Sequence, residues 1–194
     1  MFLFHSLRRV CESLCIHRFS PDAKMPLAMY LVGMIYYVAV PLTLVIESTI
    51  FSPSIQPGSR FCEPFCAPSS YILTAWIVFL YGNYEQHRAH RILARLRECD
   101  NVDAKVGNGK KHLQTRYQMP RGGWFDTVAA PHYTFEIVIY MALVIGSRFS
   151  LTAILCWSWV LSNLTVTADR THRWYQENFG KSYRTRSRLF PGAF

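Results

Sequence analysis

The sequence has few charged residues and lacks the short motifs that mark common soluble enzymes. Only 17% of its 194 residues are charged, against roughly 25% in an average soluble domain, whereas 51% are hydrophobic. No G-x-G-x-x-G opens a strand–helix unit, so any dinucleotide must be held outside a Rossmann fold. G-x-S-x-G and H-E-x-x-H are also missing, which leaves hydrolase readings without support. The six cysteines form no pair of C-x-x-C motifs, so no zinc site is expected.

Four mostly apolar stretches contain no Asp, Glu, Lys or Arg. Residues 25–46 and 149–168 supply the roughly 20 residues that a helix needs to cross a bilayer. Residues 71–81 and 137–147 are shorter, and they reach the length of a span only if flanking residues are added. For 137–147 this places Glu136 within the third span. We expect an all-α integral membrane helix bundle of about four spanning helices. A soluble all-helical core is the alternative, although such helices seldom run 20 residues without a charge.

The basic residues are distributed unequally between the two sides of this predicted bundle. If the four spans alternate, residues 1–24, 87–131 and 169–194 share one side and hold 19 of the 21 Lys and Arg residues. Loops that remain in the cytosol carry such an excess. We therefore predict that both termini are cytosolic and that the net charge of +9 reflects topology and an anionic ligand, with no nucleic-acid partner.

Two loops carry further expectations. Cys62 and Cys66 fall in the predicted non-cytosolic loop, where they form either a disulfide or two free thiols. The polar stretch 101–111, with Gly107 and Gly109, has no apolar periodicity and is predicted to be a mobile cytosolic loop.

Polar residues gather at the predicted cytosolic ends of three spans. Glu136 follows His132 by four residues, so both lie on one helix face. An acid at membrane depth calls for a partner or a function, unless it snorkels to the headgroups. Basic clusters follow the second and fourth spans, within 85–97 and 169–175. Together they suit a polyanion such as a dinucleotide pyrophosphate, and a solvated basic face is the alternative.

Four short motifs follow one another along the chain. They are YQMPRGGWF at 117–125, PHY followed by Glu136, HRWY at 172–175 and the ending LFPGAF. With them the chain resembles the steroid 5-alpha-reductase family. The segment HSLRRVCESL at 5–14 is similar to the H-x-L-R-R-x-x-E-x-L segment of the polyprenol reductase branch, and Gln86 and His90 agree with that branch.

The resemblance implies a seven-helix reductase of the endoplasmic reticulum membrane that uses NADPH. Its cofactor contacts, carried over by position, fall to Arg97, Gln118, His132, Glu136 and Tyr175. His172 matches the H-x-x-Y element beside the reaction centre and is the expected catalytic residue, because an imidazole donates a proton near neutral pH. The chain departs from the family at His132, where Asn is usual, and in its tail, SYRTRSR.

The resemblance also sets the expected domain organisation. In the family, two helices and most of a third precede the H-x-L-R-R segment, supply an acid of the catalytic pair and wall the lipid substrate. We therefore expect residues 1–24 to be the cytosolic end of a truncated helix and a loop. Residues 25–194 are expected to form the membrane-embedded C-terminal domain.

The family reaction adds hydride to the β carbon of an alkene conjugated to a carbonyl and a proton to the α carbon. An allylic alcohol offers no carbonyl to accept electrons, which favours polyprenal over polyprenol as the immediate substrate. The product would be dolichal, on the way to dolichol for N-glycosylation. The alternatives are reduction of a 3-oxo-Δ4 steroid and an inactive membrane protein that binds cofactor or partners without turnover.

Overall fold

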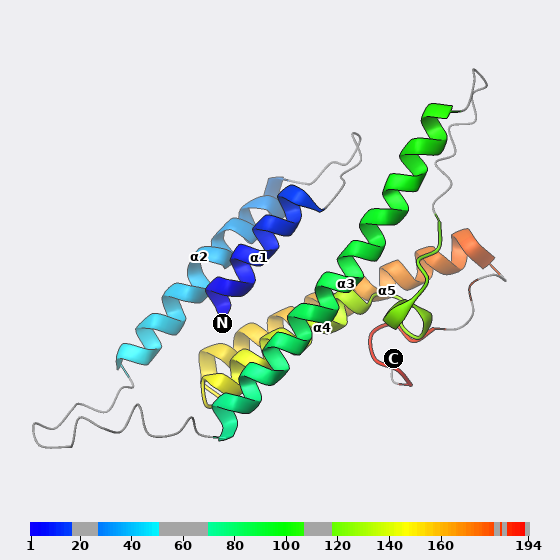
Figure 1. The fold of residues 1–194 in the computed structure, drawn as a ribbon. Coiled ribbons are helices and arrows are strands. Elements are labelled where there is room, and N and C mark those ends of the chain that lie inside the picture. Colours follow the sequence, from blue (N-terminus) through cyan, green and yellow to red (C-terminus); the bar gives the residue numbers. More distant parts are fainter. Residues whose placement is uncertain (17–26, 51–69, 107–117, 181–182, 184–185, 193–194) are drawn as a thin grey trace, which may run out of the picture.

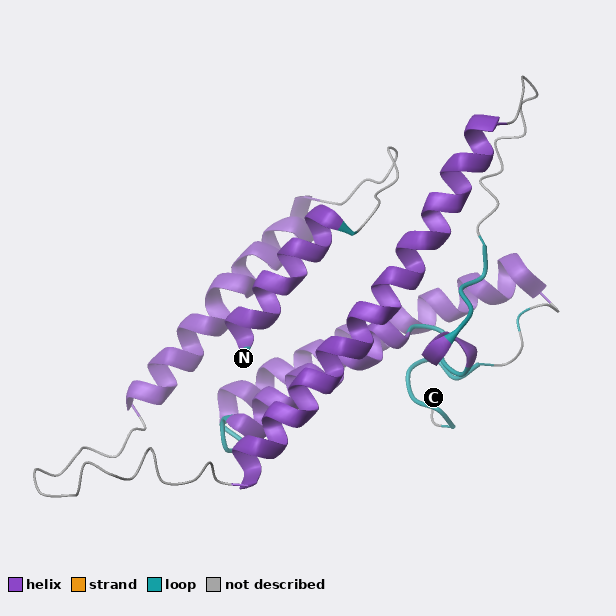
Figure 2. Cartoon of the chain, in the orientation of Figure 1, coloured by secondary structure: helices purple, strands orange, loops and turns teal. Residues whose placement is uncertain are grey.

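The computed structural model describes residues 1–16, 27–50, 70–106, 118–180, 183 and 186–192. In this part the chain is helical, without strands apart from an isolated bridge, and the prediction of an all-α fold is confirmed (Figures 1 and 2). The elements are α1 (Phe2–Cys15), α2 (Leu27–Ile50), α3 (Ser70–Val106), the 3-10 helix η1 (Gly123–Asp126), α4 (Pro131–Gly146) and α5 (Leu151–Phe179).

Most of the described residues of the uncharged stretches lie in α2, the first part of α3, α4 and α5. Among the described residues, one helix, α5, is long and apolar enough to cross a membrane by length and composition. The segment Tyr30–Thr43 and α4 are shorter apolar helices. A bundle of membrane helices therefore agrees with the structure, and the number of spans and the domain boundary at residue 24 stay predictions.

The predicted loop at 101–111 is wrong in its first half, because α3 continues to Val106. No proline or glycine interrupts residues 83–106, and a helix that is already formed adds residues at little cost. The glycines that suggested a loop come just after this helix. Residues 107–111, Cys62 and Cys66 lie outside the described part of the chain.

The helices α3 and α4 pack closely because small residues line their contact. A Cβ atom added at Gly82 would lie 2.9 Å from Cγ1 of Ile139, so this glycine allows the two backbones to approach. Ala75 is fully buried, and its Cβ lies 3.5 Å from the position that a Cβ at Gly146 would take. Small residues at helix contacts are typical of membrane bundles.

The ends of α4 and α5 are fixed by local chemistry. Pro131 occupies the first turn of α4, where its missing N–H group costs no hydrogen bond. The Ser150 side chain caps α5 by accepting a hydrogen bond from the backbone N–H of Ala153. Between these helices, Arg148 Nε donates to the Tyr71 hydroxyl at 2.6 Å, which ties the α4–α5 turn to the start of α3.

Most of the described side chains of α2 are exposed and apolar. Leu31, Ile35, Val38 and Leu42 each expose half or more of their surface. A stripe of this kind is unfavourable in water and is expected on a helix that faces lipid or further helices. In Figure 1, α2 runs beside α1, and its contacts are with α1 and α5.

Candidate functional site

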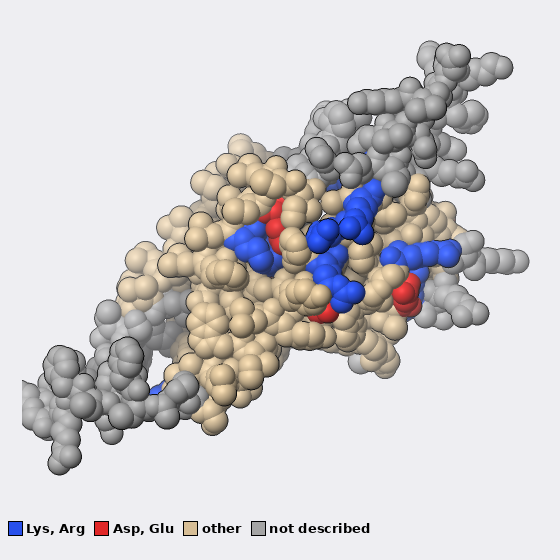
Figure 3. Space-filling view, in the orientation of Figure 1, with Lys and Arg blue, Asp and Glu red and all other residues tan. Residues whose placement is uncertain are grey.

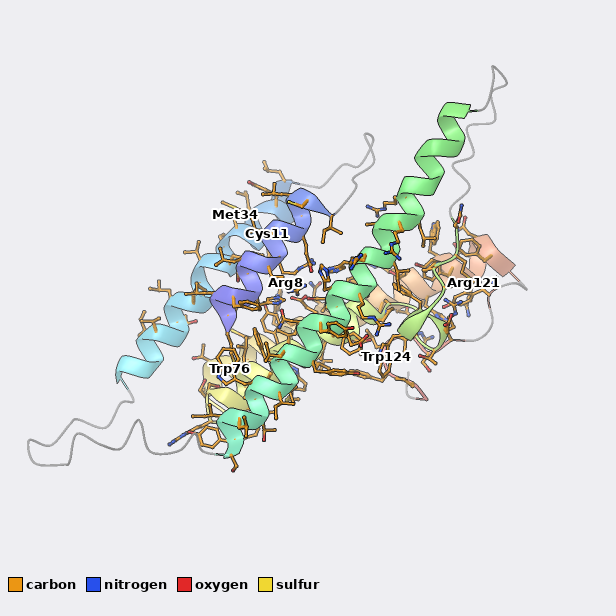
Figure 4. The ribbon with its side chains drawn as sticks, in the orientation of Figure 1. Arg8, Cys11, Met34, Trp76, Arg121 and Trp124 are labelled. Carbon is orange, nitrogen blue, oxygen red and sulfur yellow. The ribbon has the colours of Figure 1, made fainter. Side chains whose placement is uncertain are left out.

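The face of α1 that meets α3 and α4 is polar. His5, Arg8 and Glu12 are spaced by three and four residues and therefore share one side of the helix. His5 and Glu12 are buried, and Arg8 is mostly covered. Figure 4 shows Arg8 in the space between α1 and α3, where its Nε donates to Asn83 Oδ1 at 2.8 Å. The three residues belong to the H-x-L-R-R-x-x-E segment, so the structure gives that motif an interhelical role.

Glu136 of α4 has partners on two other helices. His5 Nε2 lies 3.0 Å from its Oε1, and the Gln86 side-chain amide donates to its Oε2. Gln86 also accepts a hydrogen bond from Arg8. The acid that the sequence places at membrane depth thus has partners on two other helices.

Glu12 joins α1 to α3 through several donors. His87 Nδ1 lies 2.8 Å from its Oε1, and His90 Nδ1 lies 2.8 Å from its Oε2. Arg8 and Arg9 of α1 donate to the same carboxylate. Burial by itself raises the pKa of Glu12, but the hydrogen bonds from His90 and His87 outweigh it, and the pKa falls well below its usual range.

A large cavity of about 490 Å³ opens between α3, α5 and the segment before η1. Three of the five residues expected to bind the cofactor line it: Arg97 of α3, Gln118 and Tyr175 of α5. Arg170 adds a second guanidinium, and Trp174 adds a second aromatic ring. These residues are up to 78 positions apart in the sequence (97 to 175), so the fold brings together what the resemblance had grouped.

A smaller cavity of about 210 Å³ adjoins the first, since Arg97 and Leu93 line both. His132, a further expected cofactor residue, lines it together with His90 and Arg9. The imidazole rings of His90 and His132 have centroids 5.8 Å apart. Burial lowers the pKa of His90, which favours its neutral imidazole at this wall.

His172 is buried on α5 and lines neither of these two cavities. Its Nδ1 lies 2.9 Å from the hydroxyl of Tyr183, which is also buried. Tyr175, one turn further along, contacts the same tyrosine ring at a centroid distance of 5.6 Å, so the predicted common face of His172 and Tyr175 is confirmed. His172 lies beyond the uncharged stretch that ends at residue 168, and burial lowers its pKa, with Arg188 adding to the effect.

The C-terminal segment returns to the start of α4. Ser187 forms an isolated β-bridge with Val128. The Ser187 carbonyl accepts from the N–H of Ala129 at 2.9 Å, and the Ser187 N–H donates to the carbonyl of Thr127 at 3.1 Å. The Thr134 hydroxyl donates to the Leu189 carbonyl at 2.6 Å, and Arg186 donates to the carbonyl of Pro120. The segment thereby holds the cavity wall near Pro120.

Positive charge gathers beside the cavities. Figure 3 shows Lys and Arg clustered over the second half of α3 and the neighbouring segments. Of the groups near the cavities, Asp169 of α5 pairs with Arg188 at 2.7 Å and with Arg173 at 2.8 Å. Arg97 and Arg170 line the large cavity. Their positive charges suit an anionic ligand there.

Sequence reasoning missed the contribution of α1 and of Tyr183 to this region. The i, i+3, i+7 spacing of His5, Arg8 and Glu12 was available as a signal for a buried polar face. Their partners on α3 are about 80 residues away, and no local pattern identifies such a contact.

Comparisons with known proteins agree over nearly the whole chain. A family profile described as 3-oxo-5-alpha-steroid 4-dehydrogenase matches residues 23–194. Polyprenal reductase 1 of Arabidopsis thaliana is 33% identical over 212 aligned positions, which cover 98% of this chain and 62% of the relative. Polyprenal reductase of Drosophila melanogaster is 30% identical, with 98% and 56% covered, and that of Saccharomyces cerevisiae is 29% identical, with 90% and 55% covered. The chain thus spans 55 to 62% of the length of these relatives.

Proposed function

Because the chain belongs to the 3-oxo-5-alpha-steroid 4-dehydrogenase family, we propose that it is an oxidoreductase that reduces the conjugated double bond of a polyprenal with NADPH. The polyprenal reductases of a plant, an insect and a yeast support this substrate over a steroid. The observation that carries the proposal is the convergence of Arg97, Gln118 and Tyr175 on one cavity. The product would supply dolichol for protein N-glycosylation in the endoplasmic reticulum.

The residues around the cavities fit a dinucleotide. Arg97 and Arg170 offer guanidinium groups for phosphates, and Gln118 offers an amide. Trp174 and Tyr175 provide flat surfaces for a ring system, and a volume of about 490 Å³ is within the range of cofactor sites. When bound, NADPH supplies the hydride of the reduction.

The remaining site residues take roles around this cofactor. His132 is proposed to contact the cofactor from the smaller cavity, which adjoins the phosphate-binding wall at Arg97. Glu136 is held in place by His5 and Gln86 and is proposed to orient the reactive end of the cofactor. His172 is proposed to donate a hydrogen bond or a proton to the substrate as its carbonyl gains electrons, with Tyr183 holding the ring.

The activity is tested with membranes from cells that produce this 194-residue chain and lack their own polyprenal reductase. NADPH and a long-chain polyprenal should yield the aldehyde with a saturated α-isoprene unit, whereas a 3-oxo-Δ4 steroid should remain unreduced. Mass spectrometry of the extracted lipids measures both products. Reduction of the steroid alone would establish the alternative substrate. A chain that accumulates in the membrane, is protected from protease by NADPH and reduces neither compound would be a binding protein.

The orientation in the membrane is a separate expectation, based on the 19-to-2 distribution of Lys and Arg. Epitope tags at both termini should be digested by protease added to intact microsomes, because both ends face the cytosol. A tag inserted beside Pro57 should be protected until detergent is added. Protection of the C-terminal tag would contradict the order of the spans.

A further inference from the structure

We propose that Glu12 is a positioning residue for the reduction, acting through His90 and Arg9 at the wall of the smaller cavity. This inference rests on the proposed function and extends it to α1. None of the residues expected to contact the cofactor belongs to that helix. Glu12 itself does not line that cavity, whereas His90 and Arg9, two of its four partners, do. Its influence on a bound ligand must therefore pass through them.

The contacts of Glu12 divide between its two oxygens. Oε1 faces Arg8 and His87, and Oε2 faces His90 at 2.8 Å and Arg9 at 3.2 Å. The side chains of Glu12 and His90 are only 3% and 4% exposed, so water does not compete for this pair. A carboxylate that accepts from four donors in such a place fixes the orientation of each of them.

The same contact selects the tautomer of His90. The Nδ1–H group donates to the carboxylate, so Nε2 carries the lone pair. Arg9 Nη1 lies 3.0 Å from Nδ1 and 3.1 Å from Nε2 of this ring, and of the two nitrogens only Nε2 has a lone pair to accept from it. His132 stands opposite, with ring centroids 5.8 Å apart. The wall thus presents an oriented neutral imidazole and a guanidinium, which suit a ligand with hydroxyl, amide and anionic groups.

Replacement of Glu12 by glutamine keeps the shape and loses this arrangement, because an amide nitrogen cannot accept hydrogen bonds. Glu12→Gln should raise the KM for NADPH about tenfold or more, a typical effect of losing a group that orients a binding residue. Glu12→Asp, which restores the charge, should recover part of that loss. The double variant Glu12→Gln/His90→Ala should lose less than the sum of the two single changes, because part of the effect of Glu12→Gln passes through His90.

Glu85→Gln is the matched control. Glu85 is a buried glutamate of α3 whose carboxylate pairs with Arg88 at 2.9 Å, and it does not line the smaller cavity. The Glu85→Gln variant should have a KM for NADPH within about twofold of the parent chain, because Glu85 contacts neither the cavity nor the residues of Glu12's network. An equal rise in KM for Glu85→Gln and Glu12→Gln, or additive effects of Glu12→Gln and His90→Ala, would overturn the proposal.

A second readout does not depend on activity. In the ¹⁵N spectrum of the histidine-labelled chain in lipid nanodiscs, the His90 signals, assigned by their loss in His90→Ala, should show protonated Nδ1 and unprotonated Nε2. Glu12→Gln should convert them to a mixture of tautomers, and Glu85→Gln should not. Unchanged His90 signals in Glu12→Gln would refute the positioning role whether or not the chain is active. The expected spectra from a chain that reduces no polyprenal would instead refute the proposed function.

Discussion

Replacing His172 by alanine should lower the turnover of polyprenal about 100-fold or more, the range for removing a general acid. The imidazole is buried on α5, and its Nδ1 is held 2.9 Å from the Tyr183 hydroxyl. This contact leaves Nε2 for the substrate and keeps the ring from rotating. The KM for NADPH should change little, because His172 is absent from the linings of both cavities that hold the expected cofactor residues. Steady-state kinetics in isolated membranes separates the two parameters.

Two matched variants show whether the effect belongs to the imidazole. Tyr183→Phe removes only the hydroxyl that orients His172 and should give a smaller loss, about tenfold, the lower end of what removing an orienting partner costs. His112→Ala, at a position outside the described residues, should be silent. Parental turnover in a His172→Ala chain that accumulates normally would leave this histidine with an anchoring role alone.

Charge reversal at Arg97 should weaken NADPH binding about 10- to 100-fold and NADH binding by less than about threefold. A hydrogen bond to a charged group contributes about 1.5–3 kcal/mol, and only NADPH carries the 2′-phosphate that a surplus arginine recognises. Arg97 lines both cavities, so a ligand in either one would lie beside it. The KM values of Arg97→Glu for the two cofactors, measured side by side, give the ratio directly.

Arg173→Glu is the control for a general loss of positive charge. Arg173 is 69% exposed on α5 and pairs with Asp169, and it is absent from both cavity linings. Its reversal should affect NADPH and NADH alike and only slightly, as expected for an exposed ion pair. Equal losses of the two cofactors in Arg97→Glu would mean that Arg97 serves membrane topology and not cofactor choice.

Much of the fold followed from local patterns in the sequence. An uncharged apolar stretch such as 149–168 is expected to form a helix because its backbone groups would have no other partners in lipid, and α5 covers all but the first two of these residues. The spacing of three between His172 and Tyr175 placed them on one face, and both contact Tyr183. The end of α3 was missed because the glycines after Val106 were taken to mark a loop that began earlier.

The site was predicted less completely, because its contacts join distant segments. Glu136 was identified as an acid in need of a partner, but the pattern offered His132, four residues away. The structure gives it His5 and Gln86, which are 131 and 50 residues away in the sequence. Glu12 was identified only as part of the H-x-L-R-R-x-x-E-x-L segment. It forms a hydrogen bond with His90, which is 78 residues away in the sequence.

The sequence by itself determined the helical class, the apolar stretches, the asymmetry of basic residues and the family, because each is a property of neighbouring residues or of motif order. Only the tertiary structure decided that Arg97, Gln118 and Tyr175 share one cavity and that α1 holds His90 and Glu136 through buried polar contacts. The physical reason is that a buried carboxylate such as Glu136 needs hydrogen-bond donors, and the packing of the helices supplies them from distant parts of the sequence. At Gly82 the absence of a side chain allows α3 to approach α4. The close packing of two helices depends on the whole bundle and is not visible in a local pattern.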